Sequence, residues 1–304
     1  GDRDPWRADR VAAKKSVGQT PWSARDALVP HPEQPYRHPA KHEQADGGVG
    51  RRPGGLPHDG SRMTESNNLP GKVILVTGAA KRIGRGIALR LAAEGARVAI
   101  HYSRSEKEAR HTAAECGGAE LFRADLESVG AIAGMFADVE ARLGRLDGLV
   151  NNAARFTRFD PLDITEKDWD YIHSVNLKAV FFCCQNGARL MRKTGGGRIV
   201  NISSLGGIRP WAGHAHYCAS KAGVIMLTRA LAKAFAPEIT VNSVAPGVIP
   251  FEDIDERGKR MIQATPAGRG GTPAEIADAV VYFLKASNFV TGQILAVDGG
   301  LSLK

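Results

Sequence analysis

Tyr217 and Lys221 combine residue types and a spacing that suit proton transfer. Four positions apart in a helix, the phenol and the ammonium would lie one turn apart on the same face. Because a nearby positive charge favours the phenolate, we predict that Lys221 lowers the pKa of Tyr217 toward neutral pH, where the phenol can exchange protons. Tyr-x-x-x-Lys also arises by chance in helices, so this assignment depends on the rest of the chain.

Ser204 is a third polar side chain that could act with this pair. It follows the apolar run 199–202, which predicts a buried strand whose end opens into a polar ligand site. A hydroxyl at that place could hold a substrate oxygen. Asn176 falls inside an apolar helical pattern, where a buried asparagine is more often a packing feature than a catalyst.

A glycine-rich turn earlier in the chain predicts a phosphate-binding site. The β-rich run 72–77 ends at Gly78, and a helical pattern begins after Arg82, Ile83 and Gly84. Backbone N–H groups at the start of a helix face an anion, so a strand, a glycine turn and a helix in this order suit a pyrophosphate. Gly78 would permit the tight turn, and Gly84 would permit the close approach of the pyrophosphate.

The end of the next strand, 97–101, indicates which dinucleotide would bind. It leads into Tyr102, Arg104 and Ser105, with no acidic residue. In dinucleotide-binding folds an acidic residue here holds the adenosine ribose, whereas an arginine suits a 2′-phosphate. Arg104 with Ser105 therefore favours NADPH over NADH, the alternative being an ordinary solvated arginine.

Two later strand ends supply further cofactor contacts. Asp125, followed by Leu126, could accept a hydrogen bond from the adenine amine, and its alternative role is to cap the helix that begins near Ser128. After the strand 146–150 come Asn152, Ala153 and Ala154. These small residues leave room for a flat ligand beside the backbone.

Strand and helix patterns alternate along residues 70–304. Seven strands are expected, which predicts a Rossmann-type, doubly wound parallel sheet in a single α/β domain with three α/β/α layers. The helices near 175–192 and 217–235 are apolar on most sides, so we predict that they form a helix-pair interface in a homodimer. The segment 248–271 lacks clean periodicity and is rich in charge, as expected of a mobile substrate lid.

The first 62 residues differ in composition from the rest. They hold eight of the sixteen prolines, and no strand or helix periodicity is visible there. We expect 1–62 to be a disordered or non-native extension, with Met63 as the natural start. A targeting peptide is the rival interpretation, and eight acidic residues in this segment argue against it.

Composition narrows the classes of partner and site. The net charge is +9, but no Lys/Arg run with interleaved aromatic residues indicates a nucleic-acid face, and no apolar run is long enough to span a membrane. The four cysteines and the histidines after residue 62 show no ligand spacing, so no metal is expected. Unpaired cysteines are typical of a reduced, cytoplasmic protein.

Taken together, these motifs resemble the short-chain dehydrogenases/reductases along nearly all of 70–304. The resemblance implies a nicotinamide cofactor and usually a homotetramer. The residues that carry it are Thr77-Gly78 with Gly84, Asn151-Asn152-Ala153, Asn176, Ser204, Tyr217 with Lys221, Pro246-Gly247 and Asp298-Gly299-Gly300.

The same resemblance implies roles for individual residues. Tyr217 would be the general acid, Lys221 would lower its pKa and hold the nicotinamide ribose, and Ser204 would polarise the substrate. Asn176 would anchor a water of the proton relay. Pro246, Gly247 and Ile249 would lie beside the cofactor, although the threonine that contacts the carboxamide in many relatives is missing from 248–250.

Within the family, the glycine turn is most similar to that of the pteridine reductases, which also have an arginine at the position of Arg82. The residues 101–105 and 288–292 are similar too. Phe156 falls where those enzymes place an aromatic ring over the pterin, and Trp211 would line the same pocket. Ser204 departs from their pattern, which has an aspartate there.

The sequence therefore predicts an NADPH-dependent reductase of a small carbonyl or imine, with a dihydropterin as the first substrate to consider. Ser204 favours the alternative, a 3-oxoacyl thioester or small ketone. A protein of another class, a catalytically silent module that senses NADPH, is the third possibility. Such relatives usually lose the tyrosine or the lysine, and this chain has both Tyr217 and Lys221.

Overall fold

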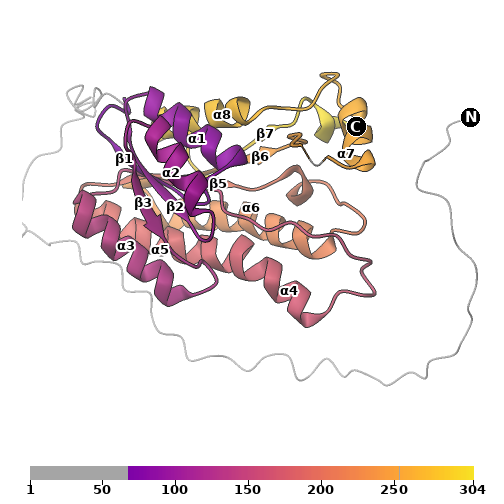
Figure 1. The fold of residues 1–304 in the computed structure, drawn as a ribbon, viewed down its shortest axis with the longest axis horizontal. Helices are drawn as coiled ribbons and strands as arrows, with labels where there is room; N and C mark the ends of the chain where they lie inside the picture. The colour runs from indigo at the N-terminus through magenta and orange to yellow at the C-terminus, as the bar shows by residue number, and fades with distance from the viewer. Residues whose placement is uncertain (1–67, 253) are drawn as a thin grey trace, which may run out of the picture. The chain divides into compact units, whose positions relative to one another are not determined.

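Seven parallel strands form one sheet in the computed structural model, which describes residues 68–252 and 254–304 (Figure 1). Their order is β3-β2-β1-β4-β5-β6-β7, and every neighbouring pair is parallel. This confirms the predicted Rossmann-type sheet, while the predicted extension 1–62 lies outside the described residues. The strands are β1 (Val73–Val76), β2 (Arg97–Tyr102), β3 (Glu120–Arg123), β4 (Gly148–Asn151), β5 (Gly197–Ile202), β6 (Ile239–Pro246) and β7 (Ile294–Val297).

Helices cover both faces of the sheet, as the alternation of side chains along the strands requires. In β1, Val73 and Leu75 point into one hydrophobic core, and Ile74 and Val76 point into the other. The first core contains residues of α3, α5 and α6, and the second contains residues of α1, α2 and α8. The helices are α1 (Arg82–Ala93), α2 (Glu106–Glu115), α3 (Val129–Leu143), α4 (Glu166–His173), α5 (Ala179–Lys193), α6 (Ala215–Phe235), α7 (Glu256–Ala264) and α8 (Pro273–Lys285), with short helical turns η2 (Ser174–Lys178), η3 (Leu205–Gly207) and η4 (Leu301–Leu303).

Two segments differ from the sequence prediction. The helix expected near 175–192 begins as the π-helical turn η2 before it continues as α5. The segment 248–271, predicted without regular structure, contains α7, whose first turn is capped by the Asp255 side chain. None of the residues of α7 is buried, so the helix lacks the buried apolar stripe by which a sequence pattern reveals a helix.

The strand order places a crevice at one edge of the sheet. The chain winds from β1 toward β3 in one direction and from β4 toward β7 in the other, so the direction of winding changes between β1 and β4. In open parallel sheets, ligands bind outside the carboxyl ends of the strands at such a switch point. No helix among the described residues is both long and apolar enough to cross a bilayer.

Candidate active site

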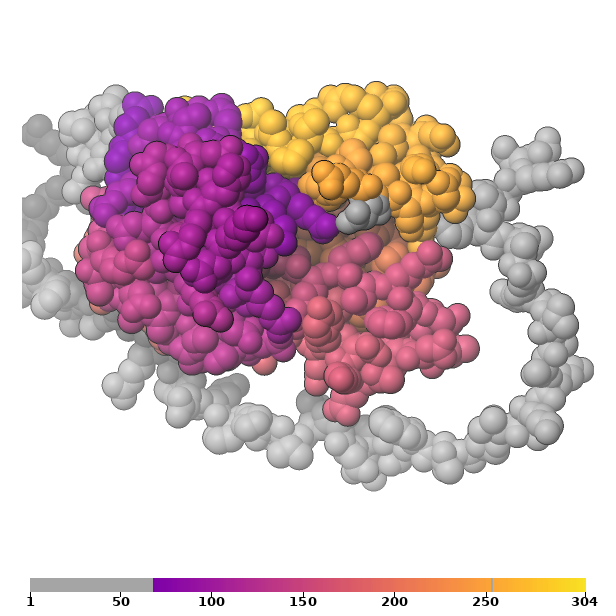
Figure 2. Space-filling view, viewed as in Figure 1, coloured from indigo at the N-terminus to yellow at the C-terminus, as the bar shows by residue number. Residues whose placement is uncertain are grey.

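A cavity of about 930 Å³ opens at this edge of the sheet. Its floor is built from residues that lie one or two positions after strands, such as Gly78 after β1, Asn152 after β4 and Ser203 after β5. The segment predicted as a lid supplies another wall, which includes Phe251 and Met261. Figure 2 shows the surface hollowed between the purple N-terminal part of the described chain and its pink and orange later segments. The volume suits a ligand of cofactor size.

Most of the predicted site residues line this one cavity. The exceptions are Tyr102, Arg104, Ser105 and Asn176. The predicted residues that do line it are Gly78, Arg82, Ile83, Gly84, Asp125, Leu126, Asn152, Ala153, Ala154, Phe156, Ser204, Trp211, Tyr217, Lys221, Pro246, Gly247 and Ile249.

The start of α1 fits a dinucleotide pyrophosphate. Its N-cap residue, Lys81, makes no side-chain capping hydrogen bond, and the first turn contains no acidic residue. The α4, α7 and α8 helices are capped by side chains, whereas the start of α1 has no such cap and faces the cavity, as a helix start that binds an anion does. Gly78 has a φ of 63°, a conformation that glycine adopts readily. Arg82 has a φ of 55°, a left-handed conformation that costs an arginine more than a glycine.

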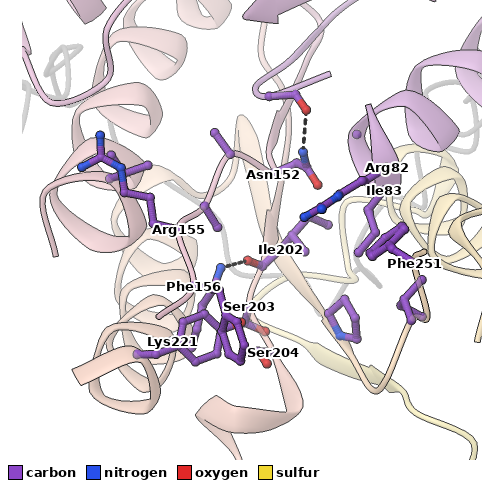
Figure 3. Close-up of a pocket in the computed structure, with 18 of the residues that line it drawn as sticks. Arg82, Ile83, Asn152, Arg155, Phe156, Ile202, Ser203, Ser204, Lys221 and Phe251 are labelled. Atoms are coloured by element: carbon purple, nitrogen blue, oxygen red, sulfur yellow. Dashed lines mark hydrogen bonds between the residues drawn. The ribbon is translucent and has the colours of Figure 1, made fainter. Parts of the chain in front are cut away.

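Polar side chains from β1 and β4 hold the turn in place. The Asn152 Nδ2 donates hydrogen bonds to the Thr77 and Gly78 carbonyls at 2.9 and 3.2 Å. The Thr77 hydroxyl accepts from the backbone N–H groups of Asn152 and Ala153. Figure 3 shows Asn152 next to Arg82 and Ile83, with a hydrogen bond from its side chain drawn as a dashed line. Asn152 thus acts first as a support for the phosphate-binding turn.

His101 is a site residue that the sequence prediction missed. It is buried at the end of β2, and its Nδ1 accepts a hydrogen bond from the Gly78 N–H at 3.0 Å. Its Nε2 lies 3.2 Å from the Ala124 carbonyl, which can only accept, so Nε2 carries the proton and the ring is neutral. Burial lowers the pKa of His101 to about 4. A buried polar residue at a strand end next to a glycine turn was the available signal.

We expect His101 to make the fold sensitive to acid. The unfolded side chain binds a proton near pH 6.5, whereas the folded one does so only near pH 4. The contribution of the neutral His101 ring to the free energy of unfolding is therefore fully present above pH 6.5. It is lost as the pH falls through 4, by about 3 kcal/mol in total. Urea unfolding at pH 7 and at pH 4.5 should show a smaller acid loss for His101→Asn than for wild type. The exposed His111→Asn serves as the control, and equal losses in all three proteins would contradict this role.

The adenosine end of the cavity differs from the prediction in detail. Tyr102 is buried in the core, and Arg104 is exposed, with no described carboxylate paired to it. Asp125 lines the cavity, and its Oδ1 accepts from the Glu127 N–H at 3.1 Å. Capping of α3 falls to Ser128, whose hydroxyl accepts from Ala131, so the alternative capping role of Asp125 is wrong.

Ser204, Tyr217 and Lys221 meet at the other end of the cavity, as predicted. The Ser204 hydroxyl lies close enough to the Tyr217 phenol to lower its pKa, and the Gly206 N–H donates to the Ser204 Oγ at 3.0 Å. The Lys221 Nζ lies 5.9 Å from the centre of the Tyr217 ring and donates to the Ile202 carbonyl at 2.8 Å, a bond drawn in Figure 3. The spacing therefore brings the three groups together.

The predicted acidity of the phenol is wrong for this structure. Burial raises the pKa of Tyr217 to about 12, and the neighbouring Ser204 hydroxyl opposes this only in part. Burial likewise lowers the pKa of Lys221 to about 8. Both shifts have one cause, because removing water disfavours the charged form of each group. Tyr217 therefore keeps its proton at neutral pH, which is the state that a proton donor needs.

Aromatic side chains surround the Tyr217 phenol. The Phe156 ring meets the Tyr217 ring edge to face, with 4.7 Å between the centroids, and stacks on the His214 ring at 4.6 Å. The Trp211 ring lies parallel to the Tyr217 ring at 6.2 Å. Phe156 is 58% exposed and lines the cavity, so part of its surface is open to a substrate. Sequence reasoning missed His214, which carries no motif of its own.

Asn176 supports the site without lining the cavity. It lies in the π-helical turn η2 and is fully buried. Its amide accepts from the Arg155 N–H at 2.7 Å, donates to the Arg155 carbonyl at 2.9 Å and donates to the Ser220 hydroxyl at 3.3 Å. Asn176 thus fixes the loop that carries Phe156 to the start of α6. Its predicted role in holding a relay water stays a prediction.

No group of three or more His, Cys, Asp or Glu side chains within 68–252 and 254–304 is arranged to hold a metal ion. The polar groups of the cavity include the glycine turn after β1 at one end and a protonated phenol with a hydroxyl at the other. Such an arrangement can hold a dinucleotide and deliver a proton to an oxygen placed beside Tyr217 and Ser204.

Comparisons with known proteins agree with this geometry. The family model described as Enoyl-(Acyl carrier protein) reductase matches residues 78–302. The 3-oxoacyl-(acyl-carrier-protein) reductase FabG of Staphylococcus aureus is 38% identical over 241 residues, which cover 76% of this chain and 98% of that protein. The 2-dehydro-3-deoxy-D-gluconate 5-dehydrogenase of Dickeya dadantii is 36% identical over 247 residues, covering 77% and 96%.

Solved structures give the same result. A short-chain dehydrogenase/reductase from Serratia marcescens is 36% identical, with a TM-score of 0.73, and the match covers 77% of this chain and 99% of that one. A gluconate 5-dehydrogenase from Burkholderia cenocepacia, solved with NADP and tartrate, is 33% identical with a TM-score of 0.74, covering 79% and 98%. The chain thus belongs to the short-chain dehydrogenase/reductase family and is an NAD(P)-dependent oxidoreductase that acts on CH-OH or C=O groups.

Proposed function

We propose that this enzyme uses NADPH to reduce a ketone to a secondary alcohol, with a 3-oxoacyl thioester as the leading substrate. The observation that carries the proposal is the pairing of the Tyr217 phenol with a neutral hydroxyl, Ser204, at the end of the cavity. A hydroxyl suits the uncharged oxygen of a ketone, whereas protonation of a ring nitrogen is helped by an acid. The similarity to FabG of Staphylococcus aureus supports the same substrate class.

The residues at this end of the cavity have separate tasks in the reduction. When bound, the dihydronicotinamide supplies the hydride for the carbonyl carbon. The Tyr217 phenol donates its proton to the carbonyl oxygen, and the Ser204 hydroxyl holds that oxygen by a hydrogen bond. The Lys221 ammonium, fixed to the Ile202 carbonyl, stabilises the phenolate that remains.

NADPH is the proposed form of the cofactor because residues 101–105 contain no carboxylate and Arg104 is not paired with a described one. The proposed contacts of the 2′-phosphate are Arg104 and Ser105. The preference is measured as the ratio of kcat/KM for NADPH to that for NADH. A ratio below one would overturn this part of the proposal.

A dihydropterin is the second substrate considered, because Phe156 presents an open ring to the cavity beside Tyr217. NADPH consumption is therefore followed with an acetoacetyl thioester and with dihydropterin under the same conditions. We expect the thioester to have the higher kcat/KM. A tenfold preference for dihydropterin would reverse the assignment, and tight NADPH binding without turnover of either substrate would favour the silent sensor.

We further propose a homodimer or homotetramer assembled through helices α5 and α6. The support is apolar surface on these helices, including Phe181 and Met226, which are 37% and 62% exposed in the single chain. Light scattering of the purified protein measures the oligomeric state.

A cytoplasmic location is also proposed, in keeping with the four free cysteines.

A further inference from the structure

Two arginines at the substrate end of the cavity, Arg158 and Arg257, have no role in the reaction described above. Both side chains line the cavity, and neither forms an ion pair with a carboxylate in the described part of the chain. Arg158 belongs to the loop after β4, and Arg257 belongs to α7. Two segments far apart in sequence therefore bring unneutralised guanidinium groups to one cavity.

Their position relative to each other is fixed by the loop 212–214. The Arg257 Nη1 donates a hydrogen bond to the Ala212 carbonyl at 2.9 Å. The Arg158 Nε lies beside Gly213, 3.5 Å from the place where a Cβ would stand at that residue. The Phe159 N–H donates to the Gly213 carbonyl at 3.0 Å, which ties the Arg158 loop to this segment. Both guanidinium groups thus lie against the short loop 212–214.

The same segment connects the arginines to the reaction centre. It ends at His214, whose ring stacks on the Phe156 ring, and Phe156 in turn meets the Tyr217 ring. Burial lowers the pKa of His214, and the positive charges of Arg257 and Arg158 lower it further. The guanidinium groups therefore lie on the Tyr217 side of the cavity.

Other cationic residues of the cavity lack this combination of features. The Lys81 ammonium pairs with Glu108 at 3.5 Å, and the Arg155 guanidinium pairs with Glu127. The Asp255 carboxylate also lines the cavity, but its Oδ1 accepts the Gly258 N–H at 2.7 Å as the cap of α7. Arg158 and Arg257 are therefore left to bind an anion that enters with a ligand.

We infer that Arg158 and Arg257 bind an anionic group, a carboxylate or a phosphate, on the substrate whose carbonyl is reduced at Tyr217. The inference rests on the proposed function, because it assigns the substrate of that same site. Guanidinium groups present paired N–H donors that match the oxygens of either anion. The carboxylate would come from a small oxo acid, and the phosphate would come from the phosphopantetheine arm of a thioester.

Matched substrates that differ in one anionic group test the inference. The first pair is acetoacetate and its neutral ethyl ester, and the second is acetoacetyl 4′-phosphopantetheine and the neutral acetoacetyl pantetheine. Wild type should prefer one of the two anionic substrates. In Arg158→Gln and Arg257→Gln, we expect kcat/KM for that preferred substrate to decrease about 30-fold. The neutral member should change by about twofold or less. Arg260→Gln, on the same helix as Arg257 but outside the cavity lining, should leave both members unchanged.

The source of the anion follows from which pair responds. A loss confined to acetoacetate identifies a carboxylate, and a loss confined to the phosphopantetheine substrate identifies a phosphate. Equal losses for the charged and neutral members would overturn the inference, because they would mean that the arginines only support the structure. A wild type that shows no preference for either charged member would also overturn it.

A binding measurement separates this inference from the proposed function. The protein loaded with NADPH is titrated by calorimetry with 3-hydroxybutyrate and, separately, with methyl phosphate. Binding of either anion that weakens about 30-fold in Arg158→Gln and Arg257→Gln supports the anion site even if no ketone is turned over. If wild type reduces neutral ketones but binds neither anion, the inference fails and the proposed function stands.

Discussion

Replacing Tyr217 with phenylalanine should lower kcat by about 10³-fold, with KM for NADPH little changed. The phenol lines the cavity and keeps its proton at neutral pH, since burial raises its pKa to about 12. Phenylalanine keeps the ring contacts with Phe156 and Trp211 and removes only the hydroxyl. Single-turnover NADPH consumption with an acetoacetyl thioester measures the loss.

A matched substitution outside the cavity controls for the change of side chain. Tyr282→Phe, on the exposed face of α8, removes a hydroxyl of the same kind and should leave kcat unchanged. Thermal unfolding of both variants should match that of wild type within a few degrees. If Tyr217→Phe kept its full rate while folded and loaded with NADPH, Tyr217 would not be the proton donor.

Gly84→Ala should destabilise the enzyme and weaken its binding of NADPH, although alanine is normally the better helix former. A Cβ at Gly84 would stand 2.5 Å from the Asn152 Nδ2 and 2.9 Å from the Ala79 Cα, so the phosphate-binding turn must shift. Such overpacking costs about 3 kcal/mol, and the helix propensity of alanine returns about 1 kcal/mol. We therefore expect a net loss of about 2 kcal/mol in the free energy of unfolding.

The shift of the turn should also weaken NADPH binding by about tenfold or more, measured by fluorescence titration. Gly134→Ala is the control, because Gly134 is an exposed glycine of α3 with no atom within 4 Å of an added Cβ. It should raise stability by about 0.5–1 kcal/mol and leave NADPH binding unchanged. Equal effects of the two substitutions would mean that the close packing at Gly84 does not matter.

The sequence was informative where function depends on local spacing. The glycine turn at 78–84 and the pair of Tyr217 and Lys221 were assigned correctly to one cavity, because each pattern is fixed by a strand end or a single helix. The sheet followed from the regular alternation of apolar strands and amphipathic helices. Asn176 was correctly found to be buried, and its bonds to Arg155 and Ser220 could not be read from spacing.

Properties that depend on distant residues were missed. The acidity of Tyr217 was predicted from Lys221 alone, yet burial, to which the Phe156 ring from a distant loop contributes, raises the pKa. His101, Arg158 and Arg257 have no motif, and they become site residues only because the fold brings them to the same edge of the sheet. Helix α7 was missed because its inner face is only half-buried and begins with Arg257 and Gly258, which do not form a recognisable apolar stripe.

The transfer of hydrogen from cofactor to substrate tests the central claim most directly. The enzyme is given an acetoacetyl thioester and NADPH that carries deuterium at both C4 positions, and the product is analysed by mass spectrometry and NMR. One deuterium bound to C3 of a 3-hydroxybutyryl thioester is the predicted result. Recovery of unlabelled thioester with unoxidised NADPH, from protein shown to bind both ligands, would contradict the account.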